Sequence, residues 1–206
     1  MDVNYTPPGV YHRSKTILSC DVKRAAFLDR DGVLNERPPA HEYLADADAL
    51  RVIPGVPEAV ARLEDAGYVP IVVSNQRGIA RLLVSPGELL RIEQRLQSEL
   101  ARAGASITAF YYCPHELDSH CNCRKPAPGL LLRAADEHGI DLRSSVLFGD
   151  SEADEGAASA VGCRAVRVGE GGEAPDLLTA VTRLLAADPP NLGGGPRVGS
   201  APRRPP

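Results

Sequence analysis

The stretch RAAFLDRDGVLN, residues 24–35, decides the fold of this chain. It opens with an uninterrupted apolar run at residues 25–28, which is followed by the polar turn Asp29-Arg30-Asp31-Gly32. A continuous rather than alternating apolar run is typical of a strand that is covered on both faces. Similar runs follow at residues 69–73, 107–112, 145–148 and 165–168. These runs predict a sheet of buried strands.

Longer segments of helical period separate the runs. They predict helices at residues 56–66, 88–103, 129–138, 153–160 and 175–187. Ser85-Pro86 is an N-cap and first-turn signal, and Gly67, Gly104 and Gly139 are C-cap signals. Strands that alternate with helices form parallel βαβ units. The predicted fold is therefore α/β, a three-layer α/β/α sandwich with a mainly parallel, Rossmann-like sheet.

Composition divides the chain into an N-terminal arm at residues 1–23, one folded domain at residues 24–187 and a tail at residues 188–206. The tail is rich in Pro, Gly and Arg and has almost no apolar side chains to bury, so we expect it to be disordered. The arm carries Pro7-Pro8-Gly9, which fits a loosely attached segment better than a core element.

Charge and hydropathy exclude several classes of protein. The 206 residues carry a formal net charge of −4, whereas proteins that neutralise a nucleic-acid backbone have a basic excess. No run approaches the roughly 18 apolar residues that a membrane span needs, and the first residues lack the apolar core of a signal peptide. We expect a cytoplasmic protein that binds neither nucleic acid nor membranes.

Polar side chains stand where three of the predicted strands end. Asp29 and Asp31 follow the first strand, Ser74-Asn75-Gln76-Arg77 follow the second and Asp150 follows the fourth. Because the carboxyl ends of parallel strands meet at one edge of a sheet, these side chains should lie together. Neighbouring carboxylates repel each other unless a cation or proton lies between them, and Mg²⁺ prefers oxygen ligands. We expect a Mg²⁺ site at Asp29, Asp31 and Asp150. The alternative is that Asp-Arg-Asp-Gly is only a turn.

Phosphoryl transfer is the chemistry that this arrangement favours. The reaction needs an in-line nucleophile and neutralisation of the charge on the transferring oxygens. Asp29 would be the nucleophile, and Lys125 with Mg²⁺ would neutralise the charge. Asp31 would protonate the leaving oxygen and later activate water, a role for which the pKa of its carboxyl group should be raised.

Three cysteines and a histidine lie close together in the sequence. Cys113-Pro114-His115 is separated by five residues from Cys121-Asn122-Cys123. In a reducing compartment such a cluster suggests a metal before a disulfide. Cys113, His115, Cys121 and Cys123 form the ligand set of a closed, structural Zn²⁺ site. His120 competes with His115 for the fourth position, and reduced thiols without a metal are the alternative.

The motifs FLDRDGVLN, VVSNQ, CRKP and LFGDSEAD resemble, in this order, the four motifs of the haloacid dehalogenase superfamily of phosphatases. The resemblance covers roughly residues 24–170. It implies that Asp29 is the nucleophile, Asp31 the acid/base residue and Asp150 a Mg²⁺ ligand. It also implies that the backbone carbonyl of Asp31 binds Mg²⁺ and that Ser74 and Lys125 bind the phosphate. A haloacid dehalogenase-like fold with a zinc-binding loop and little or no cap domain is expected.

The cysteine cluster resembles one subgroup of this superfamily. CPH followed by CxCRKP is similar to the subgroup that contains the heptose 1,7-bisphosphate phosphatases and the histidinol-phosphate phosphatases, in which the zinc loop lies beside the active site. Arg124 and Lys125 directly follow the last cysteine, so an ordered loop would direct both cations towards the substrate phosphate.

The resemblance points to a small sugar phosphate as the substrate and to a role in carbohydrate metabolism. Residues 74–81 match the heptose enzymes, which implies removal of the 7-phosphate of D-glycero-D-manno-heptose 1,7-bisphosphate. The short loop between His115 and Cys121 is closer to the histidinol-phosphate phosphatases, which are the alternative. The further candidates for substrate binding are Asn75, Gln76, Arg77, Arg81 and Arg124. Ordinary surface arginines are the other interpretation of the last three.

Two further hypotheses belong to other classes. A catalytically silent ligand-binding module would have the same fold, but loss of activity normally leaves a gap among the catalytic residues, and none is seen here. A nucleic-acid end phosphatase would need a basic groove, which the net charge of −4 disfavours. We expect a monomer whose partner is a small phosphorylated metabolite.

Overall fold

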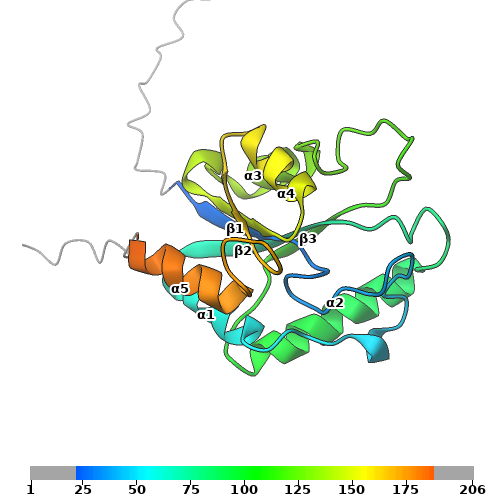
Figure 1. Ribbon diagram of the computed structural model, residues 1–206, viewed down its shortest axis with the longest axis horizontal. Coiled ribbons are helices and arrows are strands. Elements are labelled where there is room, and N and C mark those ends of the chain that lie inside the picture. The colour runs from blue at the N-terminus through cyan, green and yellow to red at the C-terminus, as the bar shows by residue number, and fades with distance from the viewer. Residues whose placement is uncertain (1–21, 188–206) are drawn as a thin grey trace, which may run out of the picture.

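The computed structural model describes residues 22–187. The predicted arm, apart from its last two residues, and the predicted tail lie outside the described residues, so the division of the chain into three parts stays a prediction. The described part contains one sheet with helices on both of its faces (Figure 1).

The sheet has five strands in the order β3-β2-β1-β4-β5, and every neighbouring pair is parallel. The strands are β1 (Arg24–Leu28), β2 (Tyr68–Asn75), β3 (Ala109–Cys113), β4 (Val146–Gly149) and β5 (Arg164–Arg167). The first apolar run of the sequence forms the central strand, and the strands that carry the other candidate residues lie on either side of it. The predicted parallel α/β sheet is confirmed.

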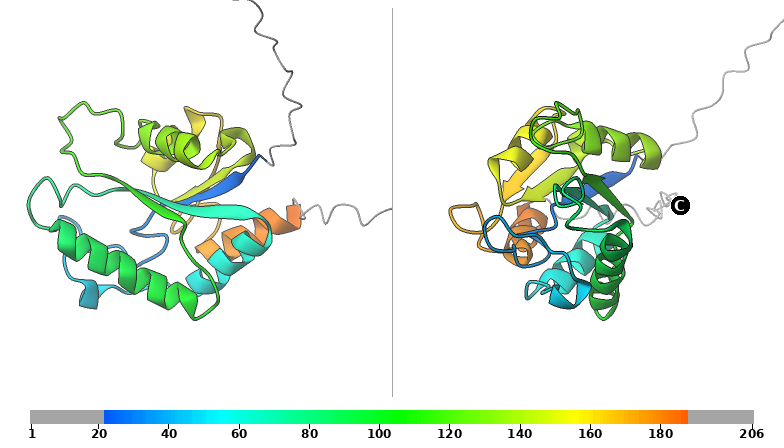
Figure 2. Two further views of the ribbon diagram at one scale, coloured as in Figure 1. Left: turned by 180° about the vertical axis from the view of Figure 1, so that it is seen from behind. Right: turned by 90° about the vertical axis from the view of Figure 1, so that its right-hand side faces the viewer.

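Helices cover both faces, which gives the three layers predicted from the sequence. The helical elements are η1 (Ala47–Ala49), α1 (Val56–Asp65), α2 (Pro86–Ala101), α3 (Gly129–His138), η2 (Leu142–Ser144), α4 (Glu152–Ser159) and α5 (Leu177–Ala187). In Figure 1, α1, α2 and α5 lie below the sheet and α3 and α4 lie above it, and Figure 2 shows the same separation from two further directions.

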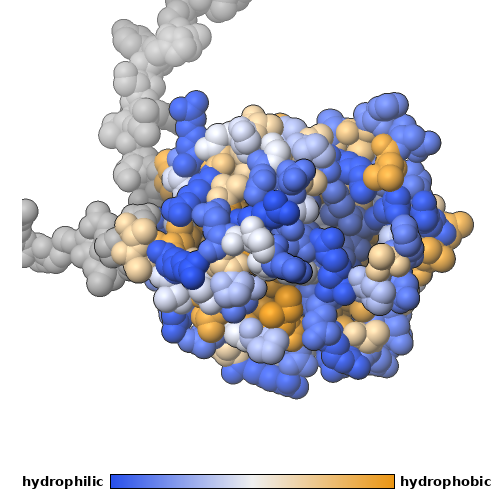
Figure 3. Space-filling view, viewed as in Figure 1, coloured by the Kyte–Doolittle hydropathy of each residue, from blue (hydrophilic) through white to orange (hydrophobic). Residues whose placement is uncertain are grey.

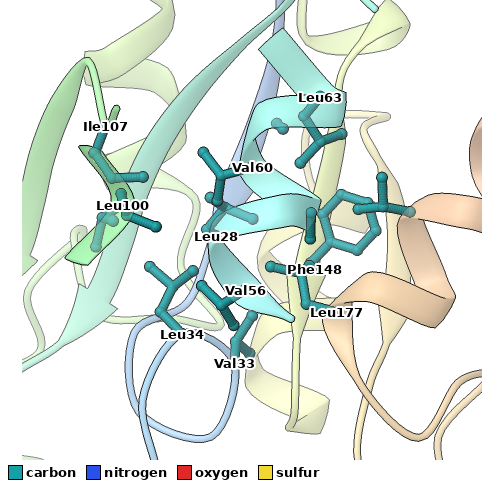
Figure 4. Packing of buried hydrophobic residues seen from close by; sticks show 14 of the residues in the cluster. Leu28, Val33, Leu34, Val56, Val60, Leu63, Leu100, Ile107, Phe148 and Leu177 are labelled. Carbon is teal, nitrogen blue, oxygen red and sulfur yellow. The ribbon is translucent and has the colours of Figure 1, made fainter. Parts of the chain in front are cut away.

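Two hydrophobic cores explain why the strands have continuous apolar sequences. Leu28 and Phe148 point to the side of α1, α2 and α5, where Figure 4 shows them packed with Val60 and other buried residues. Phe27 and Leu147, their neighbours along the chain, pack on the opposite side with α3 and α4. All four strand side chains are fully buried. Successive side chains of a strand point to opposite faces, and helices cover both faces of this sheet.

The element boundaries follow the local signals of the sequence. The Ser85 hydroxyl accepts a hydrogen bond of 3.1 Å from the backbone nitrogen of Glu88 at the start of α2, as an N-cap does. Gly139 ends α3 with a φ of 65°, which favours glycine. One difference concerns β2, which extends through Ser74 and Asn75, so these two residues end the strand instead of following it.

The loops after β1, β2 and β3 lie at one edge of the sheet, on the right of Figure 1 and on the left of the rear view in Figure 2. Within residues 22–187 the connection from β1 to α1 holds only η1, and the connection from β3 to α3 holds neither helix nor strand, so no separate cap domain covers this edge. In the same range, no helix is both long and apolar enough to cross a membrane. Hydrophilic side chains dominate the face in Figure 3.

Candidate active site

The turn after β1 brings Asp29 to the carboxyl edge of the sheet. The backbone nitrogen of Asp29 donates to the carbonyl of Phe148 at 2.9 Å, which ties this end of β1 to β4. Gly32 follows with a φ of 91°, a conformation that favours glycine. A Cβ atom at Gly32 would lie 1.8 Å from Oδ2 of Asp150, so only glycine leaves room for that carboxylate.

Asp29 is buried beside a buried cation. Its Oδ1 lies 3.0 Å from Nζ of Lys125, and the same ammonium group lies 2.5 Å from Oδ1 of Asp154. Burial raises the pKa of Asp29 above its usual range, and the charge of Lys125 opposes this effect while that of Asp154 reinforces it. The carboxylates of Asp29 and Asp154 raise the pKa of Lys125 against the effect of burial, so the lysine stays charged.

Asp31 has a different environment from the one that we expected. The guanidinium group of Arg30 lies 3.0 Å from its Oδ2, and the side-chain amides of Asn35 and Gln76 donate to its two oxygens, each at 2.9 Å. Burial opposes ionisation, but these partners outweigh it and lower the pKa of Asp31. The expectation of a raised pKa was therefore wrong for the protein without ligands, because Arg30 turns inward and pairs with Asp31.

Residues at the end of β2 position the lysine and the first aspartate. Ser74 is buried and hydrogen-bonds Asp29, and the side-chain amide of Gln76 donates to the Ser74 hydroxyl at 3.1 Å. Asn75 exchanges two hydrogen bonds of 3.0 Å with the backbone of Lys125, one to its carbonyl and one from its nitrogen. The Lys125 ammonium also donates to the carbonyl of Val73 at 2.7 Å, so β2 fixes both ends of this residue.

Asp150 and Asp154 complete a group of three carboxylates. One oxygen from each of Asp29, Asp150 and Asp154 lies within 4.8 Å of the others. Burial, together with repulsion from Asp29, raises the pKa of Asp150 to about 6, although Arg37 opposes the shift. The buried Oδ1 of Asp150 has no hydrogen-bond partner. Clustered carboxylates with an unpartnered oxygen are the ligand chemistry that Mg²⁺ requires, so these residues fit that ion.

A cavity of about 370 Å³ opens beside these groups. It is lined by Asp29, Asp31, Ser74, Asn75, Gln76, Lys125 and Arg124, and by residues 37–44 of the loop after β1. A second cavity of about 520 Å³ shares Asn75, Arg124 and Lys125 with the first and continues along residues 117–121. Seven of the candidate residues named from the sequence therefore meet at one place, and Asp150 lies behind Arg37 next to them.

Two candidate arginines are directed elsewhere. The Arg77 guanidinium donates to the Tyr43 hydroxyl at 3.0 Å, and that of Arg81 donates to Glu116 at 2.6 Å. Neither arginine lines the cavity of about 370 Å³. These contacts connect the loop after β2 to the loops after β1 and β3.

The cysteine cluster forms a compact group of four ligand atoms. Sγ of Cys113, Cys121 and Cys123 and Nδ1 of His115 lie within 4.8 Å of one another. Sγ of Cys113 is 3.6 Å from Sγ of Cys121 and 3.5 Å from Nδ1 of His115, and Nδ1 of His115 is 3.2 Å from Sγ of Cys123. A tetrahedral Zn²⁺ ion with bonds of about 2.0 to 2.3 Å separates its ligand atoms by about 3.5 to 3.8 Å. The cluster fits zinc, and the histidine of this group is His115 rather than His120.

Three residues that contact the candidate residues were not selected from the sequence. Arg30 separates the two aspartates of the first motif, and its side chain is almost completely buried. Asp154 lies in the first turn of α4 and inside the motif LFGDSEAD, and its place in that motif could have revealed it. Arg37 contacts Asp150 across 113 residues of sequence, and no local signal predicts such a contact.

Comparisons with a family model and with curated proteins point to the same family of hydrolases. A family model described as HAD-hydrolase-like matches residues 122–191. The D-glycero-beta-D-manno-heptose-1,7-bisphosphate 7-phosphatase of Vibrio cholerae serotype O1 is 40% identical over 147 residues, which cover 68% of this chain and 77% of that protein. The enzyme of the same name from Pseudomonas aeruginosa is 40% identical over 145 residues, which cover 70% of this chain and 80% of the relative.

Solved structures agree with the sequence comparison. The D,D-heptose 1,7-bisphosphate phosphatase of B. bronchiseptica, complexed with magnesium and phosphate, is 32% identical, with a TM-score of 0.73 over 80% of this chain and 99% of that chain. The corresponding phosphatase of Burkholderia thailandensis is 28% identical, with a TM-score of 0.60 over the same shares of the two chains.

Proposed function

The chain belongs to the haloacid dehalogenase-like family of hydrolases, and on this basis we propose that it removes the 7-phosphate of D-glycero-beta-D-manno-heptose 1,7-bisphosphate. The observation that carries the proposal is the group of Asp29, Asp150 and Asp154, in which Asp29 and Asp154 pair with the buried Lys125, next to a cavity that arginines line. The relatives from Vibrio cholerae and Pseudomonas aeruginosa, which are named for this reaction, support the choice of substrate and anomer.

Asp29 is the proposed nucleophile. Its carboxylate oxygen forms a bond to phosphorus as the bond from phosphorus to the sugar oxygen breaks, and an aspartyl phosphate results. Lys125 holds Asp29 in place from 3.0 Å, and its charge neutralises the transferring oxygens. A Mg²⁺ ion held by Asp29, Asp150 and the backbone carbonyl of Asp31 supplies charge neutralisation for the phosphoryl group when it is bound.

Asp31 is the proposed acid and base. It gives a proton to the leaving sugar oxygen, and it later takes one from the water that hydrolyses the aspartyl phosphate, which regenerates Asp29 and releases phosphate. Arg30 keeps Asp31 ionised while the site is empty of substrate. The anionic phosphate of an arriving substrate raises the pKa of a neighbouring carboxyl group, so Asp31 takes up its proton together with the substrate.

A phosphate-release assay over a panel of substrates tests the function. The panel contains both anomers of the heptose bisphosphate, heptose 7-phosphate, histidinol phosphate and a 5′-phosphorylated oligonucleotide, each with Mg²⁺. We expect kcat/KM to be highest for the β-anomer of the bisphosphate. Comparable turnover of histidinol phosphate would overturn this choice, and no turnover of any compound would favour the silent binding module.

The remaining expectations about partners and location belong to this proposal. We propose that the protein works in the cytoplasm as a monomer and does not bind nucleic acid, in keeping with its net charge of −4. Light scattering coupled to size-exclusion chromatography tests the monomer. A mass of twice 21.9 kDa would contradict it.

A further inference from the structure

Arg37 is a cation at the mouth of the candidate active site. It lies in the irregular, proline-containing loop between β1 and η1, and 57% of its side chain is exposed. Its guanidinium group forms an ion pair with Oδ2 of Asp150, and its Nε would lie 3.3 Å from a Cβ atom at Gly32. Arg37 also lines the cavity of about 370 Å³.

The carboxylate that Arg37 contacts is also part of a site for a metal ion. Asp150 belongs to the group of three carboxylates that fits Mg²⁺, and its side chain is only 12% exposed. A divalent cation at this group competes with the guanidinium for Asp150 and repels it. Because Arg37 is on an exposed loop, its side chain can leave Asp150 without disturbing the core.

A released Arg37 would stand beside a cavity with few other available cations. Among residues 22–187, the arginines and lysines that line it are Arg37, Arg124 and Lys125. Lys125 is held between Asp29 and Asp154. Arg77 and Arg81 do not line the cavity: Arg77 donates to the hydroxyl of Tyr43, and Arg81 pairs with Glu116. A substrate with a second phosphate therefore meets two guanidinium groups, which suit bidentate binding of phosphate.

We propose that Arg37 is a specificity-determining residue that binds the second, non-transferred phosphate of the substrate when it is released from Asp150, as it would be with Asp150 holding a Mg²⁺ ion. This inference rests on the proposed function and extends it, because it assigns the preference for a bisphosphate to a residue outside the family motifs. Without a metal ion, Arg37 thus neutralises the charge of Asp150. With a metal ion at Asp150, Arg37 neutralises the charge of the substrate instead.

Steady-state kinetics of Arg37→Gln at saturating Mg²⁺ test the proposal. Loss of a charge-assisted hydrogen bond should raise KM for the heptose 1,7-bisphosphate about tenfold. The kcat for the bisphosphate and the KM for heptose 7-phosphate should change less than about twofold, because neither involves the second phosphate. Arg37→Lys should restore part of the affinity. The matched control is Arg62→Gln, which removes an exposed arginine that pairs with Glu58 on α1.

The proposed change of partner of Arg37, from Asp150 to the second phosphate, can also be tested without measuring turnover. Isothermal titration of Mg²⁺ into the substrate-free protein should show at least about threefold tighter binding for Arg37→Gln than for the wild type, because the competing cation is gone. Equal or weaker Mg²⁺ binding would overturn the change of partner, and an equal loss of affinity for the mono- and bisphosphate would overturn the role in specificity. If the wild type does not hydrolyse the bisphosphate, the proposed function fails and this inference fails with it.

Discussion

The ammonium group of Lys125 lies 3.0 Å from the carboxylate of Asp29, and both groups are buried at the carboxyl edge of the sheet. The two residues are 96 positions apart in sequence, and the hydrogen bonds between Asn75 and the Lys125 backbone bring them together. Lys125 balances the charge of Asp29, the proposed nucleophile. The same ammonium group can also help to neutralise the charge of a bound phosphate.

Asp29→Asn tests the nucleophile. The amide is a poor nucleophile for phosphorus, so we expect phosphate release to fall by at least about a thousandfold. The variant should stay folded, since it removes a carboxylate that burial and Asp154 disfavour in the charged form. Circular dichroism and the release assay check both points, with the exposed residue change Asp65→Asn as a control at wild-type rate. Turnover within tenfold of the wild type would contradict the role of Asp29.

Lys125→Met should affect stability as well as activity. Its side chain is 2% exposed and that of Asp154 is 1% exposed, and removal of one partner leaves buried carboxylates without their cation. We expect the free energy of unfolding to fall by about 3 to 5 kcal/mol. Adding Asp154→Asn to this variant should restore part of the stability but none of the activity. Urea denaturation measures the change, and a loss below about 1 kcal/mol would show that the pair is not a structural element.

Cys121→Ser tests the zinc cluster. Purified wild-type protein should contain one zinc ion per chain, and the variant should contain far less. Loss of the ion should lower Tm by at least about 5 °C, with a smaller effect on the catalytic rate through Arg124 and Lys125. Cys163→Ala, which changes a buried cysteine outside the cluster, should leave the zinc content unchanged. An active, stable wild-type protein without zinc would contradict the assignment.

The dependence of stability on Mg²⁺ should change with pH. The pKa of Asp150 is raised to about 6 from an ordinary value of 3.8. The folded protein without metal therefore binds this proton more tightly than the unfolded chain does, so the resulting stability is present below about pH 4 and is lost as the pH rises through 6. Mg²⁺ binds the ionised carboxylate, and the rise in Tm that it causes should be larger at pH 7 than at pH 5.

Thermal melts at both pH values, with Mg²⁺ and with chelator, measure this difference. Asp150→Asn serves as the control, because it cannot ionise and should show little Mg²⁺ effect at either pH. A wild-type Mg²⁺ effect of the same size at pH 5 and pH 7 would contradict the raised pKa of Asp150.

Much of this fold could be predicted because local signals agreed with the global arrangement. The continuous apolar runs of β1 and β4 require cover on both faces, and the caps at Ser85 and Gly139 mark helix ends in the structure where the sequence placed them. The meeting of Asp29, Ser74 and Asp150 also followed, because the ends of neighbouring parallel strands share an edge, whereas the place of Lys125 followed only from the family resemblance.

Side-chain partners that depend on burial could not be predicted in the same way. The sequence pattern assigns no role to Arg30, yet its inward orientation lowers the pKa of Asp31 instead of leaving it raised. The pair of Arg37 and Asp150 joins a loop to a strand end across 113 residues, and its formation depends on how the loop packs. Periodicity and motif spacing contain no information about either contact.

The central position of β1 between β2 and β4 means that the candidate site uses chain segments from residue 29 to residue 154. A nascent chain that has emerged only as far as α3 already carries Asp29 and Lys125 but has neither Asp150 nor Asp154. Such a chain cannot release phosphate during its synthesis, and a proteolytic fragment that ends before β4 stays equally inert. Enzymatic turnover therefore requires a chain that has been made and folded at least through the first turn of α4.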